Sequence, residues 1–155
     1  GHAGGALAAE QVLYTARNPR SHATAEWRSL DALLAESDIV SLHIPLSAET
    51  AGLIDAERLA RMKPGAILVN TARGGLVDEA ALLDALAGGR LAGAGLDVFA
   101  AEPLPPGHPL LTLPNVVLAP HVAWLTRETL TRSLEVAVEN CRRLQAGTPL
   151  LFRVV

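Results

Sequence analysis

Residues 66–78 read AILVNTARGGLVD, a stretch that predicts a buried strand, a polar turn after it and then the start of a helix. Its residues 67–69 form a short apolar run, which is typical of a parallel strand covered on both faces. Turn-forming pairs bound the run, with Pro64-Gly65 in front and Gly74-Gly75 behind. Arg73 is therefore expected just beyond the carboxyl end of a central strand, which is where ligands bind in open α/β sheets.

The position of Arg73 has two interpretations. A guanidinium offers five N–H donors in a rigid fork that matches the geometry of a carboxylate, so Arg73 could bind a small anionic ligand. Alternatively, Arg73 pairs with a nearby acidic residue at the surface. Position alone favours neither interpretation.

The composition is that of a single domain rich in small and aliphatic residues. A chain of 155 residues is long enough for one domain with a real core, and half of its residues are hydrophobic although only 3% are aromatic. The net charge of −3 gives no reason to expect nucleic acid as a partner. No apolar run approaches the ~20 residues of a membrane-spanning helix and no signal-peptide pattern is present, so we expect a cytoplasmic protein.

Predicted strands and helices alternate along the chain. Short apolar runs predict strands at residues 12–15, 39–43, 67–69, 92–99 and 116–118. Apolar periodicity and polar capping residues predict helices at 29–36, 56–62, 79–87 and 126–146. This alternation predicts an α/β fold with a parallel sheet and right-handed crossovers. Cys141, the one cysteine, lies on the apolar side of the last predicted helix, where we expect a buried thiol.

The first ten residues are rich in Gly and Ala and have two interpretations. They could be the remnant of a glycine-rich phosphate loop and of the helix that follows it. The full G-x-G-x-x-G pattern is absent, however, and no strand precedes them. The alternative is a frayed apolar terminus.

Two arginines, Arg17 and Arg20, follow the predicted strand at 12–15, and no acidic residue accompanies them there. In dinucleotide-binding folds an acidic residue near the end of the second strand hydrogen-bonds the ribose, whereas an arginine accommodates the 2′-phosphate of NADP. The pair therefore favours NADP(H) if this strand belongs to such a fold. A solvated basic turn is the alternative.

Three ionisable residues follow separate predicted strands, namely Arg73, Glu102 and His121. In a parallel sheet these strand ends converge on one edge. An arginine can hold a carboxylate, a histidine can transfer a proton near neutral pH, and a glutamate can orient the imidazole. The set therefore suits general acid–base chemistry on a small anionic carbonyl compound.

Four longer motifs occur in order along most of the chain. They are SDIVSLHIPL at 37–46, MKPGAILVNTARGG at 62–75, AGLDVF at 94–99 followed by Glu102-Pro103, and Pro120-His121. Together they resemble the D-isomer-specific 2-hydroxyacid dehydrogenase family, and the resemblance extends roughly from residue 12 to 149. It implies a Rossmann-like, doubly wound parallel sheet. The segments 13–20 and 102–113 look like the glyoxylate/hydroxypyruvate reductase branch.

The resemblance implies a function for each matching residue. Arg73 would hold the substrate, His121 would donate the proton to the carbonyl oxygen, and Glu102 would support His121. The residues implied to line the cofactor are Ile44, Pro45, Thr71, Ala72, Asp97 and Ala123, with Arg17 added from its position after the strand. The implied reaction is hydride transfer between NAD(P)H and a small 2-keto acid, and no residue is assigned to a metal. The arginines after the strand at 12–15 add the expectation that NADPH is preferred over NADH.

The chain also departs from the family pattern. The phosphate loop and first strand are missing or degenerate, and the N-terminal part of the substrate domain is absent. We therefore interpret residues 1–146 as a dinucleotide-binding domain truncated at its start, and 147–155 as a tail returning toward a missing substrate domain. Trp124 stands where many members have Gly.

Three hypotheses follow for the whole protein. The first is an active reductase, a homodimer when intact, of which this chain alone is inactive. The second is a non-catalytic scaffold of the same fold that senses a dinucleotide. The third is an inactive truncated product.

Overall fold

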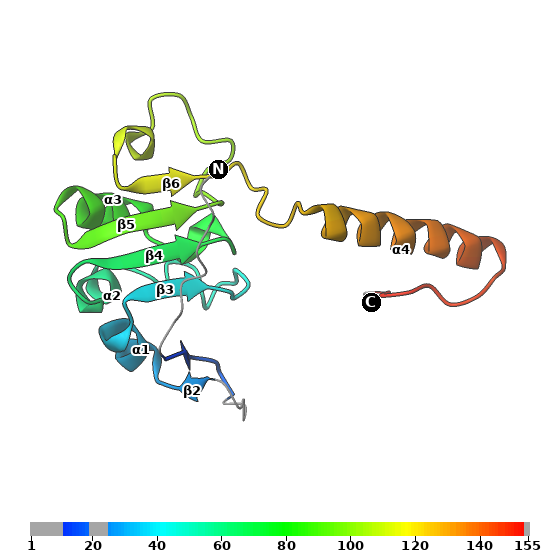
Figure 1. Ribbon diagram of the computed structural model, residues 1–155, viewed down its shortest axis with the longest axis horizontal. Helices are drawn as coiled ribbons and strands as arrows, with labels where there is room; N and C mark the ends of the chain where they lie inside the picture. The colour runs from blue at the N-terminus through cyan, green and yellow to red at the C-terminus, as the bar shows by residue number, and fades with distance from the viewer. Residues whose placement is uncertain (1–10, 19–24, 154–155) are drawn as a thin grey trace. The chain divides into compact units, whose positions relative to one another are not determined.

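The computed structural model describes residues 11–18 and 25–153 (Figure 1). It divides into two compact units, Gly1–Pro120 and His121–Val155, and each is considered by itself. The glycine-rich start at residues 1–10 and the predicted phosphate contact of Arg20 lie outside the described residues.

A four-stranded parallel sheet forms the centre of the first unit (Figure 1). Its order is β3-β4-β5-β6, and the strands span Ile39–Leu42, Ala66–Asn70, Leu91–Leu96 and Val116–Leu118. The last residues of the four strands stand in one register row, formed by Leu42, Asn70, Leu96 and Leu118. The turns that follow β3, β4 and β5 therefore start at the same edge of the sheet. The predicted parallel α/β architecture is confirmed.

A second parallel pair precedes this sheet. It consists of β1 (Leu13–Tyr14) and β2 (Glu26–Trp27), and the sequence did not predict β2. The doubly wound dinucleotide-binding fold has the strand order 3-2-1-4-5-6. The pair β2-β1 fits strands 3-2 of this pattern and β3-β4-β5 fits strands 4-5-6, β6 adds one further strand at that end, and no described strand takes the place of strand 1.

Three helices of the first unit begin at the capping residues that the sequence predicted. They are α1 (Leu30–Glu36), α2 (Ala56–Arg61) and α3 (Glu79–Ala87). The side chains of Ser29, Asp55 and Asp78 accept hydrogen bonds from the N–H groups of Ala32, Arg58 and Ala81. Each cap satisfies one of the donors that a helix start leaves without a partner.

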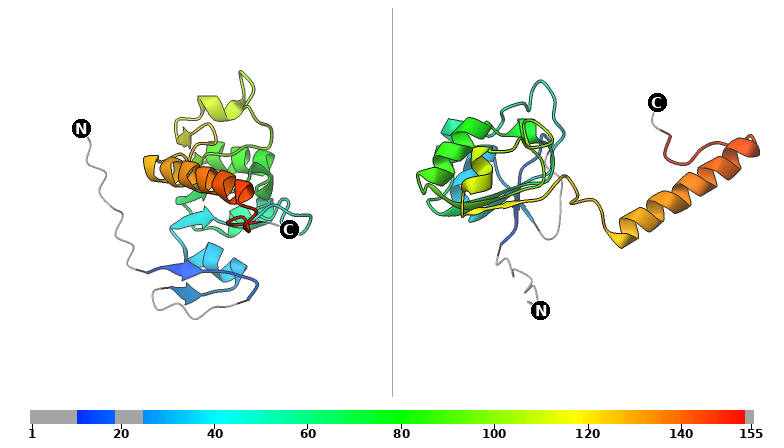
Figure 2. Two further views of the ribbon diagram at one scale, coloured as in Figure 1. Left: turned by 90° about the vertical axis from the view of Figure 1, so that its right-hand side faces the viewer. Right: turned by 90° about the horizontal axis from the view of Figure 1, so that it is seen from above.

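The core lies between the helices and one face of the sheet (Figure 2). Leu68 of β4 is fully buried in this core, and Leu82 and Leu86 of α3 are each only 2% exposed. On the opposite face Ile39 and Ile67 remain 44% and 38% exposed, so the described residues cover one face of the sheet. Strand alternation turns Ile39 and Ile67 to the face opposite the core. The expectation that both faces are covered is not met within these residues, because they leave those side chains exposed.

Two short 3-10 helices were not predicted. The first, η1 (Gly74–Leu76), follows the turn after β4, and the second, η2 (Pro109–Thr112), precedes β6. Proline starts η2 because its fixed φ suits a first helical position and its missing N–H costs nothing there.

The second unit consists of a short turn, the helix α4 (Arg127–Gln145) and a tail. Thr126 caps α4 through a bond from the N–H of Thr129, so the predicted bounds are confirmed. The tail turns back along the helix, where the Asn140 amide donates to the carbonyl of Leu151 (3.2 Å) and accepts from its N–H (2.8 Å).

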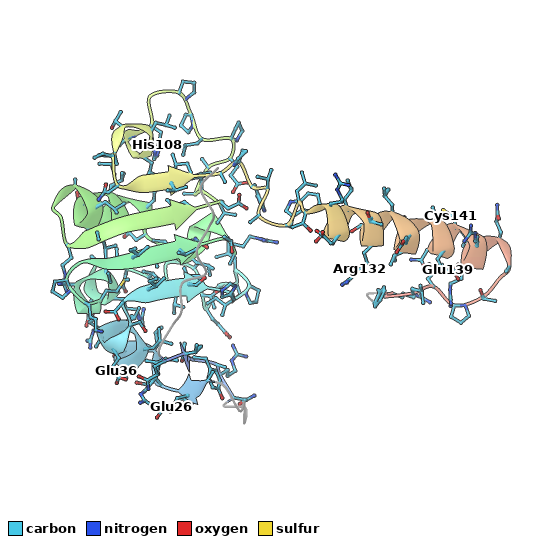
Figure 3. All side chains as sticks on the ribbon, viewed as in Figure 1. Glu26, Glu36, His108, Arg132, Glu139 and Cys141 are labelled. Carbon is cyan, nitrogen blue, oxygen red and sulfur yellow. The ribbon has the colours of Figure 1, made fainter. Side chains whose placement is uncertain are left out.

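None of the residues of α4 is buried in the described chain. Cys141 is exposed (Figure 3), so the prediction of a buried thiol is wrong for these residues. The pattern places a residue on an apolar side of a helix but does not supply the surface that covers it. Among the helices that the structure describes, none is long and apolar enough to cross a membrane.

Candidate functional site

The turns after β3, β4 and β5 pack directly against one another. A Cβ atom at Gly74 would lie 1.9 Å from the carbonyl oxygen of Phe99, and one at Gly75 would lie 3.0 Å from Cδ2 of Leu46. The Phe99 contact is with main chain, which cannot move aside as a flexible side chain can. Gly74 is therefore required for the turn that carries Arg73 to meet the segment that carries Glu102.

The turn that carries Arg73 is organised by the buried side chain of Asn70. This residue ends β4 and is 1% exposed. Its Nδ2 donates to the carbonyl of Arg73 (2.9 Å), and its Oδ1 accepts from the N–H of Ala72 (3.1 Å). A buried amide that makes both bonds fixes a turn strongly, because losing either partner leaves a polar atom unsatisfied. The sequence analysis missed Asn70, although a polar residue that ends an apolar strand was the available signal.

Arg73 itself is exposed at the edge of the sheet. Its Nη1 donates to the carbonyl of Ala72 at 2.6 Å. Within residues 11–18 and 25–153, no carboxylate forms an ion pair with Arg73, so the surface salt-bridge interpretation finds no support there. The guanidinium is accessible for an anionic ligand.

Asp97 directly follows β5 and is only 4% exposed. Its N–H donates to the carbonyl of Asn70 at 3.0 Å, which joins the carboxyl ends of the two central strands. Asn70 and Asp97 are the buried polar residues among those the structure describes. A carboxylate so deeply placed is costly without hydrogen-bonding partners, so its position at the binding edge is informative.

The carboxylate of Glu102 is bound by the main chain of its own segment, residues 99–102. Oε1 of Glu102 accepts a hydrogen bond from the N–H of Phe99 at 3.0 Å. A second carboxylate, that of Glu79 at the start of α3, accepts from the N–H of Ala100 at 3.3 Å. Glu102 is exposed, and the predicted cofactor-lining residues Ile44, Pro45, Thr71 and Ala72 stand on the turns at the same edge.

His121 and Ala123 belong to the second unit and are placed within it. His121 is half-buried and has φ 56°, in the left-handed region that few non-glycine residues adopt. The indole N–H of Trp124 donates to the His121 carbonyl at 3.1 Å, which closes the turn that leads into α4. Trp124 thus has a structural role that the sequence analysis did not identify.

Arg17 lies after β1, as predicted. Its Nη2 contacts Oε2 of Glu49 at 2.5 Å, and the two side chains are 81% and 73% exposed. Glu49 stands in the turn after β3, so Arg17 extends toward that turn. Such an exposed pair contributes little to stability, about 0–1 kcal/mol, and can open for a competing anion.

Comparison with known proteins identifies the family. The sequence model of the D-isomer specific 2-hydroxyacid dehydrogenase, NAD binding domain, matches residues 5–123. The chain belongs to the D-isomer-specific 2-hydroxyacid dehydrogenase family. The resemblance inferred from the motifs is therefore confirmed. Because the matching model is that of an NAD-binding domain, it supports a nicotinamide dinucleotide as the cofactor.

Individual members of the family show the same likeness. The chain is 55% identical over 122 residues to a glyoxylate reductase of Korarchaeum cryptofilum, covering 79% of this chain and 37% of that protein. It is 53% identical over 135 residues to glyoxylate/hydroxypyruvate reductase B of Pectobacterium carotovorum, covering 83% and 42%. It thus spans less than half the length of these two relatives.

A solved structure supports the fold of this dehydrogenase-family chain. The D-isomer specific 2-hydroxyacid dehydrogenase from Xanthobacter autotrophicus Py2, in complex with NADPH and MES, matches with a TM-score of 0.79 at 42% identity. The match covers 94% of this chain and 61% of that one.

The chemistry of the carboxyl edge fits a nicotinamide dinucleotide. The buried carboxyl group of Asp97 is an acceptor suited to the carboxamide of a nicotinamide. Ile44 and Pro45, directly after β3, present apolar surface suited to a ring face. The exposed guanidinium of Arg73 adds a binding group for an anionic substrate at the same edge.

Proposed function

We propose that this chain supplies the dinucleotide-binding part of an NAD(P)H-dependent reductase of small 2-keto acids such as glyoxylate or hydroxypyruvate. The observation that carries the proposal is the close packing of the turns bearing Arg73, Asp97 and Glu102 at one sheet edge. The relatives named as glyoxylate and hydroxypyruvate reductases support the substrate class.

The residues of the chain then have distinct tasks. A bound reduced nicotinamide supplies the hydride for the carbonyl carbon. Arg73 binds the substrate carboxylate through its fork of donors, and His121 donates the proton to the carbonyl oxygen, so that the carbonyl group becomes a hydroxyl group. Glu102 orients the imidazole of His121 and supports it during proton transfer.

The residues proposed to hold the cofactor come from several turns. They are Arg17, Ile44, Pro45, Thr71, Ala72, Asp97 and Ala123. Together they bind and orient the nicotinamide dinucleotide, and the apolar members exclude water from the ring. Exclusion of water strengthens the electrostatic contacts on which the transfer depends.

The test compares the full-length protein with the 155-residue chain, each assayed with glyoxylate, hydroxypyruvate and either cofactor. We expect saturable turnover for the full-length protein and little for the chain, because positioning the substrate and excluding water require a second domain to close over the site. A full-length protein that binds NADH or NADPH without reducing any 2-keto acid would indicate the scaffold hypothesis instead.

We further propose that the full-length protein prefers NADPH to NADH through Arg17. A ribose 2′-phosphate would compete with Glu49 for this guanidinium, and charge-assisted bonds to phosphate are strong. The measurement is kcat/KM for both cofactors at fixed salt, before and after Arg17→Ala. A selective loss for NADPH is expected, and an equal change for both cofactors would assign Arg17 to a solvated turn.

The remaining expectations concern the assembly and its location. We propose a homodimer in the cytoplasm for the full-length protein, both implied by the family resemblance. Light scattering after size-exclusion chromatography measures the first, and cell fractionation measures the second.

A further inference from the structure

A pair of side chains outside the proposed catalytic set joins three segments of the first unit. Nε2 of His108 lies 3.1 Å from Oε1 of Glu79, and the two side chains are only 15% and 25% exposed. Glu79 is the first residue of α3, and His108, labelled in Figure 3, caps η2 in the connection between β5 and β6. The third segment joins through the bond from the Ala100 N–H to Oε2 of Glu79 at 3.3 Å.

The hydrogen-bond partners define how the pair works. Nδ1 of His108 accepts from the N–H of Leu110 at 3.3 Å, so in a neutral imidazole the proton resides on Nε2. That Nε2–H then donates to Oε1 of Glu79, while Oε2 of the same carboxylate accepts from Ala100. Both oxygens of Glu79 are thus acceptors, which an ionised carboxylate provides and an amide does not.

The segment held by Glu79 is the one that carries Glu102. On one side the main chain of Phe99 packs against Gly74, next to Arg73. On the other side Ala100 is bonded to Glu79, and the Phe99 N–H is turned to the Glu102 carboxylate. The main chain from Phe99 to Ala100 is therefore fixed from two directions.

We propose that Glu79 and His108 are positioning residues that hold the segment of residues 99–102, and with it the Glu102 carboxylate, for the reaction. The inference rests on the proposed function, since it assigns the pair an effect on Glu102 rather than on substrate binding. Small displacements of a group that supports the reacting atoms reduce turnover strongly, by up to about 10²-fold for a shift near 1 Å.

Two substitutions in the full-length protein separate positioning from simple stability. Glu79→Ala removes both acceptors, whereas His108→Asn retains an N-cap for Leu110 and loses only the bond to Glu79. We expect each to lower kcat about 10-fold or more while KM for the 2-keto acid changes less than about 2-fold. Glu79→Gln, which has one acceptor oxygen, is expected to fall between Glu79→Ala and the parent.

A double-mutant cycle identifies the route of the effect. If the pair acts through Glu102, then Glu79→Ala changes kcat by less than about 2-fold in a Glu102→Gln background, although it has its full effect in the parent. The matched control is Arg90→Met, which removes bonds from Arg90 to the carbonyls of Ala60 and Met62 and so loosens the attachment of α2. It should lower the Tm but leave kcat within about 2-fold. Effects of Glu79→Ala that multiply with those of Glu102→Gln would overturn the proposal.

Amide hydrogen exchange provides a measurement that does not need activity. Glu79→Ala should accelerate exchange of the Ala100 N–H by about 10-fold or more, since its acceptor is gone. Unchanged exchange in residues 99–102 would show that the pair does not hold this segment. A parent protein without reductase turnover would overturn the proposed function, and the exchange rates would still decide whether the pair holds the segment.

Discussion

The helices α3 and α4 present similar rows of leucine, but only the row of α3 is buried. Leu82 and Leu86 are each 2% exposed, because α3 packs on the central sheet. On α4, Leu134 and Leu144 are 59% and 72% exposed. The comparison teaches that apolar periodicity predicts a helix and its apolar side, whereas burial depends on a surface that another part of the structure must supply.

The two units also position chemical groups differently. In the first unit, buried Asn70 and the contact at Gly74 hold the turns that carry Arg73 and Glu102. In the second unit His121 stands in a short turn in which the indole N–H of Trp124 donates to its carbonyl and the N–H of Leu125 donates to the carbonyl of Val122. His121 is half-buried and is proposed as the proton donor, so this contrast between the two units can be tested directly.

The largest effect is expected at that histidine. In the full-length protein, His121→Ala should lower kcat by about 10²–10⁴-fold, because it removes the general acid. Trp124→Phe is the control in the same turn, since phenylalanine keeps an aromatic ring at this position but lacks the indole N–H that donates to the His121 carbonyl. Steady-state kinetics with glyoxylate and hydroxypyruvate measure both. Near-normal kcat for His121→Ala on every keto acid would assign proton donation to another group.

Truncating a leucine should destabilise the chain far more on α3 than on α4. Leu82→Ala should lower the free energy of unfolding by about 2–5 kcal/mol, because it opens a cavity in the packed core. Leu134→Ala in the same 155-residue chain should change it by less than about 0.5 kcal/mol, as is usual for exposed positions. Urea unfolding of the variants measures both. A comparable loss for Leu134→Ala would mean that the α4 face is covered in solution.

One glycine in each unit, Gly74 and Gly147, differs in how much space surrounds its main chain. Gly74→Ala should cost about 1–3 kcal/mol by overpacking against the Phe99 main chain, and it should also lower kcat in the full-length protein by displacing Arg73. Gly147 has φ +67° with open space around it, so Gly147→Ala should cost only about 1 kcal/mol. Thermal unfolding and kinetics measure both. Equal kinetic effects of the two substitutions would contradict the close contact at Gly74.

The smallest effect concerns acid stability, where two carboxyl groups in the described part of the chain, one in each unit, have a lowered pKa. The hydrogen bond from Arg28 lowers the pKa of Glu26, and main-chain and Thr126 bonds at the start of α4 lower the pKa of Glu128. Since the unfolded chain binds protons at a higher pH, these groups stabilise the fold above their unfolded pKa. That stability is lost as the pH falls through their folded pKa.

Arg28→Gln tests this in the first unit, and Thr126→Val tests it in the second. Each should flatten the dependence of Tm on pH below about pH 5, where these carboxyl groups become protonated. The expected changes are small because both groups are exposed. A steeper decline of Tm in acid for either variant would contradict the direction of the shift.

Local chemistry allowed much of the architecture to be predicted. Ser29, Asp55 and Asp78 cap their helices as expected, because a side-chain oxygen beside a helix start needs only the next few residues as partners. The strands that precede Arg73 and Asp97 were predicted from short apolar runs, which are likewise a local feature of the sequence. By contrast, β2 consists of only two exposed residues, Glu26 and Trp27, and forms only through its pairing with β1.

The amino-acid sequence was enough to predict the helices with their caps, the parallel strands and the charged residues after the strands, because each depends on neighbours within a few positions. It was also enough to predict the family, because several motifs occur in order along the chain. Only the tertiary structure decided that Asn70 organises the Arg73 turn, that Glu79 meets His108 across 29 positions, and that Arg17 meets Glu49. It also decided which leucines are buried. These contacts join segments far apart in the chain, and their formation depends on how the strands align, which local pattern does not specify.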